Sequence, residues 1–271
     1  MSNFFTRISQ KIFYVAQFAK IEHIFVRRFI KKGAFMRVHF ALPLIISLAT
    51  SAGAATREDI LNEGQRALSE NNIPHAVSLY ESYLKNNPKD VEVLCLLAMS
   101  QGFAGNPASQ ETYSRKALTL DPRAPDALAN LGNALSTQEK WEEAERTYLD
   151  GYAQAKDRRD PSSMRNIACA LSNLYMTRPA PNDHEAIRWA DLCLARISQS
   201  VLSGQGAFIG LHTVRPMEAM LEMATYSAAT LNKASAYGNL GETQKAIGVL
   251  EAHLKRYPQD PQAKALLERL T

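Results

Sequence analysis

Apolar residues recur every three to four positions over most of residues 57–271, with polar residues between them. This spacing places the apolar side chains on one face of a helix, so it predicts a series of amphipathic helices. The helices come in pairs joined by polar turns, and several pairs end with Asn or Asp before a Pro, which stops a helix. The pattern therefore predicts an all-α fold built from helical hairpins.

The hairpins repeat at a regular interval. Pro88 and Pro122 are 34 residues apart, and the segments Ala76–Pro88 and Ala246–Pro258 carry Ala and Leu at equivalent places. A single hairpin cannot bury its apolar face alone, so the repeats are expected to stack into one core within residues 55–271. We divide this part of the chain into five repeats, one insertion and a closing helix: 57–90, 91–124, 125–158, 161–199 and 227–260, the insertion 200–226, and the closing helix 261–270. Within the insertion, residues from Pro216 onward are predicted to be helical, so the alternative is a lengthened first helix of the fifth repeat.

Small residues mark the places where paired helices approach one another. Gly64 and Gly132 each stand twelve residues before an alanine, Ala76 and Ala144. Antiparallel helices come close only where side chains are small, so each glycine is predicted to face its alanine across the hairpin. A tyrosine four residues after each alanine is predicted to fill the space toward the next hairpin. Two further glycines are expected to permit the turn between paired helices: Gly105 and Gly241.

Ten of these residues resemble the signature of the tetratricopeptide repeat (TPR) family: Gly64, Ala76, Tyr80, Pro88, Pro122, Gly132, Ala144, Tyr148, Ala246 and Pro258. The resemblance covers nearly all of residues 57–271. It departs from the pattern at Gln110, where a small residue is expected, and at Lys156, where a proline is expected. The resemblance implies a right-handed superhelical solenoid of about five helical hairpins plus a C-terminal capping helix. It also implies a concave groove lined by the first helix of each hairpin.

The sixth residue of each repeat is asparagine in four of the five repeats: Asn62, Asn130, Asn166 and Asn232. Helical geometry places them on the face that lines the groove, and Asn133 lies one turn after the second of them. An amide side chain can donate and accept at once, which suits the backbone of an extended peptide. In related repeat proteins, asparagines at this place bind peptide backbone. We therefore predict a peptide-binding groove at these five residues; the alternative is that asparagine simply fits the helix there.

Residues 1–54 have the features of a targeting segment. Basic residues precede the nine-residue apolar run FALPLIISL at 40–48, and Ala52 and Ala54 form an A-x-A cleavage signature. The run is too short to span a bilayer comfortably, which takes about 20 residues. We predict a secretory signal peptide cleaved after Ala54, with translation from Met36 left open. The protein is then exported and periplasmic; the alternative is an uncleaved signal that anchors it in the inner membrane.

The charge of the chain is unevenly distributed. The 271 residues carry a net charge of +4, but residues 1–54 hold eight basic residues and one acid. The rest of the chain is therefore mildly acidic and has no basic stripe of the kind that neutralises phosphates. No nucleic-acid partner is predicted, and a membrane is contacted only through the N-terminal segment if it stays uncleaved.

No motif for catalysis, metal binding or cofactor binding is present in the sequence. The three cysteines, Cys95, Cys169 and Cys193, form no C-x-x-C, and no two histidines of residues 55–271 have metal-site spacing. We predict no enzyme activity, no cofactor and no metal. Cys169 and Cys193 lie on the two helices of the fourth hairpin, so whether they pair in an oxidising compartment stays open.

These observations together predict a binding module. The expected function is a non-catalytic scaffold or adaptor that binds a partner protein or peptide in its groove. Its expected setting is the assembly of a bacterial envelope, pilus or secretion complex, which rests on the signal sequence and on analogy with exported repeat proteins. The alternative is a membrane-anchored or cytoplasmic chaperone for a secretion substrate, with residues 1–54 retained.

Overall fold

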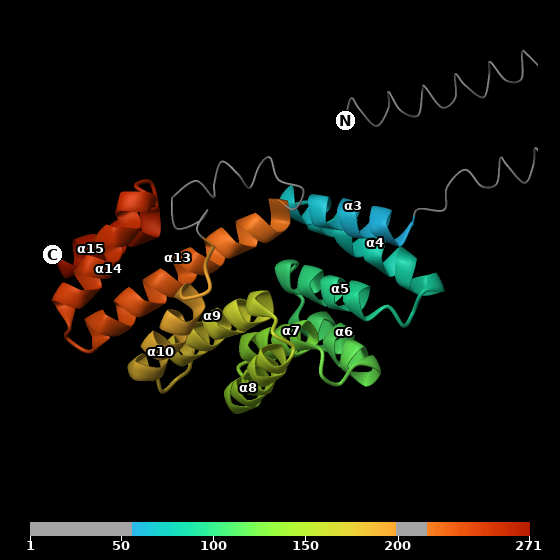
Figure 1. The fold of residues 1–271 in the computed structure, drawn as a ribbon, viewed down its shortest axis with the longest axis horizontal. Coiled ribbons are helices and arrows are strands. Elements are labelled where there is room, and N and C mark those ends of the chain that lie inside the picture. The colour runs from blue at the N-terminus through green and yellow to red at the C-terminus, as the bar shows by residue number, and fades with distance from the viewer. Residues whose placement is uncertain (1–55, 199–215) are drawn as a thin grey trace, which may run out of the picture. The chain divides into compact units, whose positions relative to one another are not determined.

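The structure is a computed structural model that describes residues 56–198 and 216–271. Within these ranges the chain forms eleven α-helices and no strand (Figure 1). The predicted signal peptide at 1–54, with its alternative start at Met36, and residues 200–215 of the predicted insertion lie outside the described residues. The prediction of an all-α fold is confirmed.

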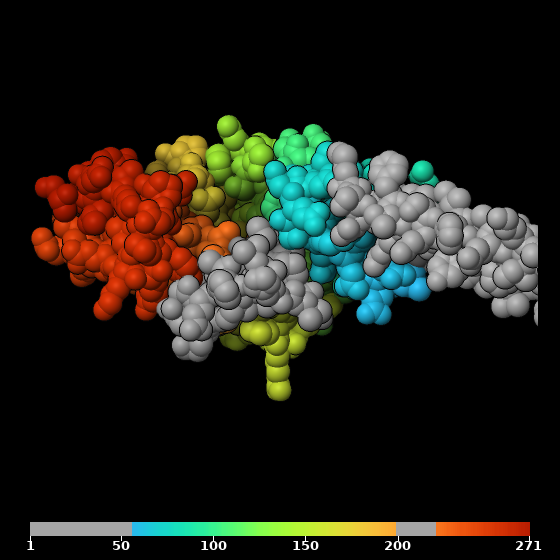
Figure 2. Space-filling view, turned by 90° about the horizontal axis from the view of Figure 1, so that it is seen from above, coloured from blue at the N-terminus to red at the C-terminus, as the bar shows by residue number. Residues whose placement is uncertain are grey.

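The helices pack as antiparallel pairs in chain order, and each pair packs on the next (Figure 1). In the space-filling view of Figure 2, the first hairpin in blue and the C-terminal helices in red lie at opposite ends of the described part of the chain. The five pairs are α3 (Arg57–Ser69) with α4 (Ile73–Asn86), α5 (Val91–Phe103) with α6 (Pro107–Leu120), α7 (Pro125–Thr137) with α8 (Trp141–Asp157), α9 (Pro161–Thr177) with α10 (Asp183–Leu194), and α13 (Pro216–Asn239) with α14 (Thr243–Arg256). The closing helix α15 (Pro261–Leu270) packs on α14 and α13. The fold is therefore five hairpins and a C-terminal helix, as the repeat pattern predicts.

Aspartates fix where several helices begin. Asp90, Asp160 and Asp260 precede α5, α9 and α15. Each carboxylate accepts a hydrogen bond of 3.0–3.2 Å from a backbone N–H two or three residues later. Such a cap stabilises a helix by about 1 kcal/mol because it satisfies a donor that the helix leaves open. Pro161 and Pro261 follow two of these caps, at the position where a helix needs no N–H.

Four hairpins turn through the same left-handed backbone position. It is occupied by Asn71, Gly105, Glu139 and Gly241, with φ of 57°, 75°, 59° and 74°. The N–H of the following residue then bonds a carbonyl five positions earlier, which closes the end of the first helix. The prediction for the two glycines is confirmed. The structure adds that asparagine and glutamate take up this position in the first and third repeats.

The side chains that come nearest to Gly64 and Gly132 are the tyrosines that follow the alanines. A Cβ placed on Gly132 would lie 2.5 Å from ring carbons of Tyr148, and the nearest atoms to a Cβ on Gly64 belong to the ring of Tyr80. The tyrosine follows its alanine by one helical turn, and its side chain packs on the bare backbone of the glycine. Both rings are buried. Each glycine therefore makes room for a tyrosine, which packs inside its own hairpin.

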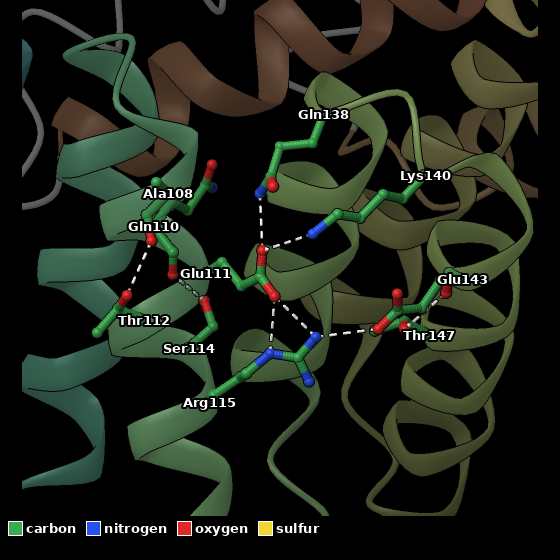
Figure 3. A network of polar contacts seen from close by, with 10 residues as sticks. All are labelled: Ala108, Gln110, Glu111, Thr112, Ser114, Arg115, Gln138, Lys140, Glu143 and Thr147. Atoms are coloured by element: carbon green, nitrogen blue, oxygen red, sulfur yellow. Dashed lines mark hydrogen bonds and ion pairs between the residues drawn. The ribbon is translucent and has the colours of Figure 1, made fainter.

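Two equivalent glutamates join neighbouring hairpins. Glu111 on α6 accepts hydrogen bonds from Gln138 and Lys140, which flank the turn of the next hairpin, at 2.8 and 3.3 Å (Figure 3). Glu145, 34 residues later on α8, accepts from the Tyr175 hydroxyl at 2.6 Å and from Arg178 at 3.1 Å. In both cases a carboxylate on a second helix holds the end of the following first helix. We call these two sites the glutamate clamps.

The first helix of the fifth hairpin is longer than the repeat frame predicts. α13 has 24 residues, whereas α3, α5 and α7 have 13 each. Residues 216–226, which the sequence places in the insertion, are continuous with this helix. The helix predicted from Pro216 onward is therefore confirmed, and residues 216–226 lengthen the first helix of the fifth repeat, which was the alternative to a separate insertion.

Candidate peptide-binding site

The predicted site lies on the first helices of the hairpins. α5, α7, α9 and α13 contact one another in chain order, and α13 also contacts α3. We call the surface formed by these five helices the first-helix face. The predicted asparagines fall on α3, α7, α9 and α13, so they are spread along this face rather than gathered at one point.

Asn130 is partly used by the protein itself. It lies on α7, its side chain is buried, and its Nδ2 donates a hydrogen bond of 2.9 Å to the carbonyl oxygen of Cys95 on α5. This bond ties two neighbouring first helices together through the second lone pair of a helix carbonyl. One of the two Nδ2 hydrogens of Asn130 is therefore used inside the protein, and Oδ1 is left to accept.

Asn133 has the opposite arrangement. Its Oδ1 accepts a hydrogen bond of 2.6 Å from the hydroxyl of Tyr148. Burial raises the pKa of Tyr148, so the hydroxyl stays protonated and remains the donor. The side chain of Asn133 is exposed, and its two Nδ2 hydrogens are free of partners among the described residues. Both donors of this amide are therefore open to a ligand, while one of the two acceptor sites of Oδ1 is taken by Tyr148.

The two amides complement one another. Asn130 and Asn133 are three residues apart on α7, so they lie on the same side of one helical turn. One presents an acceptor and the other a donor, and each orientation is fixed by a bond to the protein. The backbone of an extended peptide carries one N–H and one C=O at nearly every residue. The pair can therefore bind a peptide backbone whatever the side chains of that peptide are.

The other three predicted asparagines differ in exposure. Asn62 is exposed on α3. Asn166 on α9 and Asn232 on α13 are half-buried, and Oδ1 of the first and Nδ2 of the second have no hydrogen-bond partner among the described residues. Buried polar atoms are rarely left unpaired, so both atoms keep a hydrogen-bonding capacity that the described residues do not use. Leu96 takes the equivalent place on α5 and interrupts the row.

The sequence analysis missed an apolar stripe on α5. Leu96, Met99 and Phe103 are three and four residues apart, so they share one side of this helix, and Phe103 is 47% exposed. The opposite side of α5 is buried in the core through Val93 and Leu97. A helix that is apolar all round is the signal that could have revealed the stripe. The stripe lies on the helix next to α7 and its amide pair.

One cluster contains the residue types of a hydrolase but not the geometry. Nε2 of His253 lies 2.8 Å from Oδ2 of Asp260 and 3.4 Å from Oγ of Ser227, and the same carboxylate oxygen accepts from Ser227 at 2.9 Å. In a catalytic triad the carboxylate and the hydroxyl bond different ring nitrogens. Here Nδ1 is buried with no partner among the described residues. The cluster therefore joins α13, α14 and the start of α15 and does not activate a nucleophile.

The described residues also bear on metal, thiol and membrane chemistry. They contain no group of three or more His, Cys, Asp or Glu that could hold a metal ion. Cys95, Cys169 and Cys193 are free thiols and all three are buried. No helix in residues 56–198 or 216–271 combines the length and the apolar character that crossing a bilayer requires.

Comparison with known proteins supports the repeat architecture. Residues 127–162 match the sequence model of the tetratricopeptide repeat family. No curated protein matches the chain in sequence. The structure resembles TTC0263, a thermophilic TPR protein of Thermus thermophilus, with a TM-score of 0.57 and 16% identity over 79% of this chain and 98% of that one.

Two further solved structures resemble the chain with TM-scores below 0.5. PilF of Pseudomonas aeruginosa has a TM-score of 0.45 and 18% identity over 79% of this chain and 97% of its own. YrrB, described as a TPR protein with an unusual peptide-binding site, has a TM-score of 0.46 and 14% identity over 81% and 95%. With one repeat matched in sequence and the hairpin stack matched in structure, the described part of the chain folds as a tetratricopeptide repeat solenoid.

Proposed function

We propose that this protein is a non-catalytic scaffold that binds an extended segment of a partner protein on its first-helix face. The observation that carries this proposal is the complementary amide pair on α7. Asn130 offers an acceptor, Asn133 offers a donor, and the bonds to Cys95 and Tyr148 hold both in place before any ligand arrives. Groups that are already oriented lose little conformational freedom on binding, which favours affinity.

The neighbouring helix suggests what kind of segment binds. The stripe of Leu96, Met99 and Phe103 on α5 is apolar and partly exposed. Methionine and aromatic side chains adapt to the shape of an apolar ligand. We therefore propose a partner segment that is held by its backbone at α7 and that places apolar side chains against α5.

The amide pair can be tested with a substitution that leaves the protein intact. Asn133→Asp keeps an oxygen for the Tyr148 hydroxyl but removes both Nδ2 donors. We expect a photo-reactive residue at Phe103 to cross-link a partner in cells, and Asn133→Asp to lower the yield about five- to tenfold. That factor corresponds to the loss of one hydrogen bond of about 1 kcal/mol or slightly more.

The matched control is Asn86→Asp, which makes the same chemical change at an exposed residue on α4. It should leave the cross-link unchanged. If Asn133→Asp and Asn86→Asp give equal cross-linking yields and equal melting temperatures, the amide pair does not contribute to partner binding.

We propose further that the scaffold is exported and serves the assembly of an envelope, pilus or secretion complex. The support is the N-terminal sequence, where basic residues, an apolar run and the A-x-A signature at Ala52 and Ala54 follow one another. The mature N-terminus measured by mass spectrometry tests this proposal. An N-terminus at Ala55 supports export, whereas an intact Met1 or Met36 favours the anchored or cytoplasmic chaperone.

A further inference from the structure

The N-terminal part of α13 lies outside the repeat frame. We call residues 216–226 the α13 extension. They precede the fifth repeat and lengthen its first helix to 24 residues. Figure 1 shows the N-terminal end of α13 beside α3, and the two helices are in contact. A helix of the fifth hairpin thus reaches the first hairpin, which stacking of successive repeats alone does not require.

A buried ion pair docks the extension on the first-helix face. Glu222 lies 3.2 Å from Arg165 on α9, and the two side chains are only 14% and 12% exposed. Oε1 of Glu222 also accepts a hydrogen bond of 2.6 Å from the backbone N–H of Ser198, just after α10. A buried carboxylate needs such partners, since an unpaired charge away from water is strongly disfavoured. Glu222 is therefore the polar anchor of the extension.

The same side of the extension makes further contacts with the fourth hairpin. The thiol of Cys169 on α9 donates to the carbonyl oxygen of Thr225 at 3.5 Å. Tyr226 is buried against Ile197, with Met223 packed at the edge of this small cluster. Residues 222, 225 and 226 share one side of the helix, so the extension rests on α9 and on the end of α10 along a single line.

Groups beneath and beside the anchor are left without partners. Nε of Arg165 and Oδ1 of Asn166 are both buried and unpaired among the described residues. The extension therefore covers a part of the first-helix face whose hydrogen-bonding capacity is not used up. A peptide backbone supplies the missing acceptor for Arg165 and the missing donor for Asn166.

We propose that the α13 extension is a strap that crosses the first-helix face from the fourth hairpin to α3, and that a partner segment binds after displacing it. This proposal rests on the proposed function, because it assigns a regulation to the same face. The strap is held by the Glu222 anchor, the bond from Cys169 and one small apolar cluster, and by its contact with α3. We expect it to open more readily than the rest of α13, which packs inside the fifth hairpin. The backbone of the partner segment then forms hydrogen bonds with Nε of Arg165 and Oδ1 of Asn166, which have no partner among the described residues while the strap is in place.

Alkylation of the native cysteines measures displacement of the strap when no partner protein is present. Cys169 lies against α13 through its bond to Thr225, whereas Cys95 lies on α5 and serves as an internal reference. In the full chain, we expect Glu222→Gln to raise the rate of alkylation of Cys169 by iodoacetamide at least fivefold. The rate at Cys95 and the helical circular dichroism should stay the same.

A matched control breaks a different partly buried ion pair. Glu145→Gln removes the partner of Arg178, a pair of 3.1 Å between α8 and the turn after α9, and it should leave alkylation of Cys169 unchanged. An unchanged rate of Cys169 alkylation in the Glu222→Gln variant would contradict the proposal that residues 216–226 form a strap. Equal acceleration at Cys95 would do the same, because the variant would then be loosening the whole fold.

Amide hydrogen exchange supplies a second test on the unmodified protein. Amides of residues 222–226 should exchange at least tenfold faster than those of 230–236 in the same helix, and Glu222→Gln should widen the difference. Equal protection of the two segments would overturn the proposal. Neither measurement needs a partner, so failure of the strap is distinguishable from failure of the peptide-binding proposal, which depends on the cross-link at Phe103.

Discussion

Replacing Gly132 by alanine tests the contact at the centre of the third hairpin. The new Cβ would lie 2.5 Å from two ring carbons of Tyr148, where ordinary contact begins near 3.4 Å. The ring is 2% exposed, and its hydroxyl is bonded to Asn133, so it has little room to move. We therefore expect Gly132→Ala to force the helices of this hairpin apart.

The magnitude follows from three contributions. Overpacking a core costs about 1–3 kcal/mol, and misplacing the Tyr148 hydroxyl costs about 1 kcal/mol more. Alanine is a better helix former than glycine by about 1 kcal/mol, which offsets part of the loss. The free energy of unfolding should fall by about 2 kcal/mol. For a domain of this size the melting temperature should then fall by about 4–8 °C.

Gly248→Ala is the matched control, since it makes the same change on α14 where a Cβ would meet no described atom within 4 Å. It should stabilise the protein by about 0.5–1 kcal/mol, because glycine inside a helix is unfavourable. Urea unfolding followed by circular dichroism compares the two variants. A Gly132→Ala variant as stable as the wild type would refute the reasoning. Adding Tyr148→Leu should recover part of the loss, so the two effects should not be additive.

Two further predictions concern the turns and the clamps. Gly105→Ala should lower stability by about 1–2 kcal/mol in urea unfolding, since φ of 75° suits glycine but not alanine. Glu111 has its pKa held below its usual value, mainly by the Gln138 hydrogen bond and then by Arg115 and Lys140. Its stabilisation is present above the unfolded pKa and is lost as the pH falls through the folded pKa. Acidification from about pH 6 to pH 3 should therefore destabilise Glu111→Gln less than the wild type.

The sequence predicted the hairpins well because their signals are local. Helical periodicity, the prolines after paired helices and the glycines at Gly105 and Gly241 each act within a few residues. The length of α13 was harder to predict. The pattern from Pro216 predicts a helix, but it leaves open whether this helix belongs to an insertion or lengthens the fifth repeat. In the structure Glu222 and Tyr226 of the lengthened helix have partners on the fourth hairpin and just after it. Such partners come from tertiary contacts, which a repeat pattern does not contain.

The helices that carry the predicted asparagines could be read from the sequence, but the hydrogen bonds of these asparagines could not. The row of asparagines does fall on first helices, but helical spacing says nothing about which amide atoms the protein uses for itself. The bond from Asn130 to Cys95 depends on how closely α5 and α7 approach, and the bond from Tyr148 to Asn133 depends on the ring that fills the space at Gly132. Both distances are set by packing between helices.

The glutamate clamps have a mechanical consequence for the solenoid. Glu111 ties the second hairpin to the turn of the third, and Glu145 ties the third to the end of α9 in the fourth. Val77 stands at the equivalent place in the first repeat, and its side chain offers no acceptor. The three middle hairpins are thus joined twice by the same kind of contact, one repeat apart. The first joint is held differently, by Arg57 on α3 with Asp90 and Glu92 at the start of α5, so a long ligand meets a repeated spacing at the centre and a different joint at the N-terminal end.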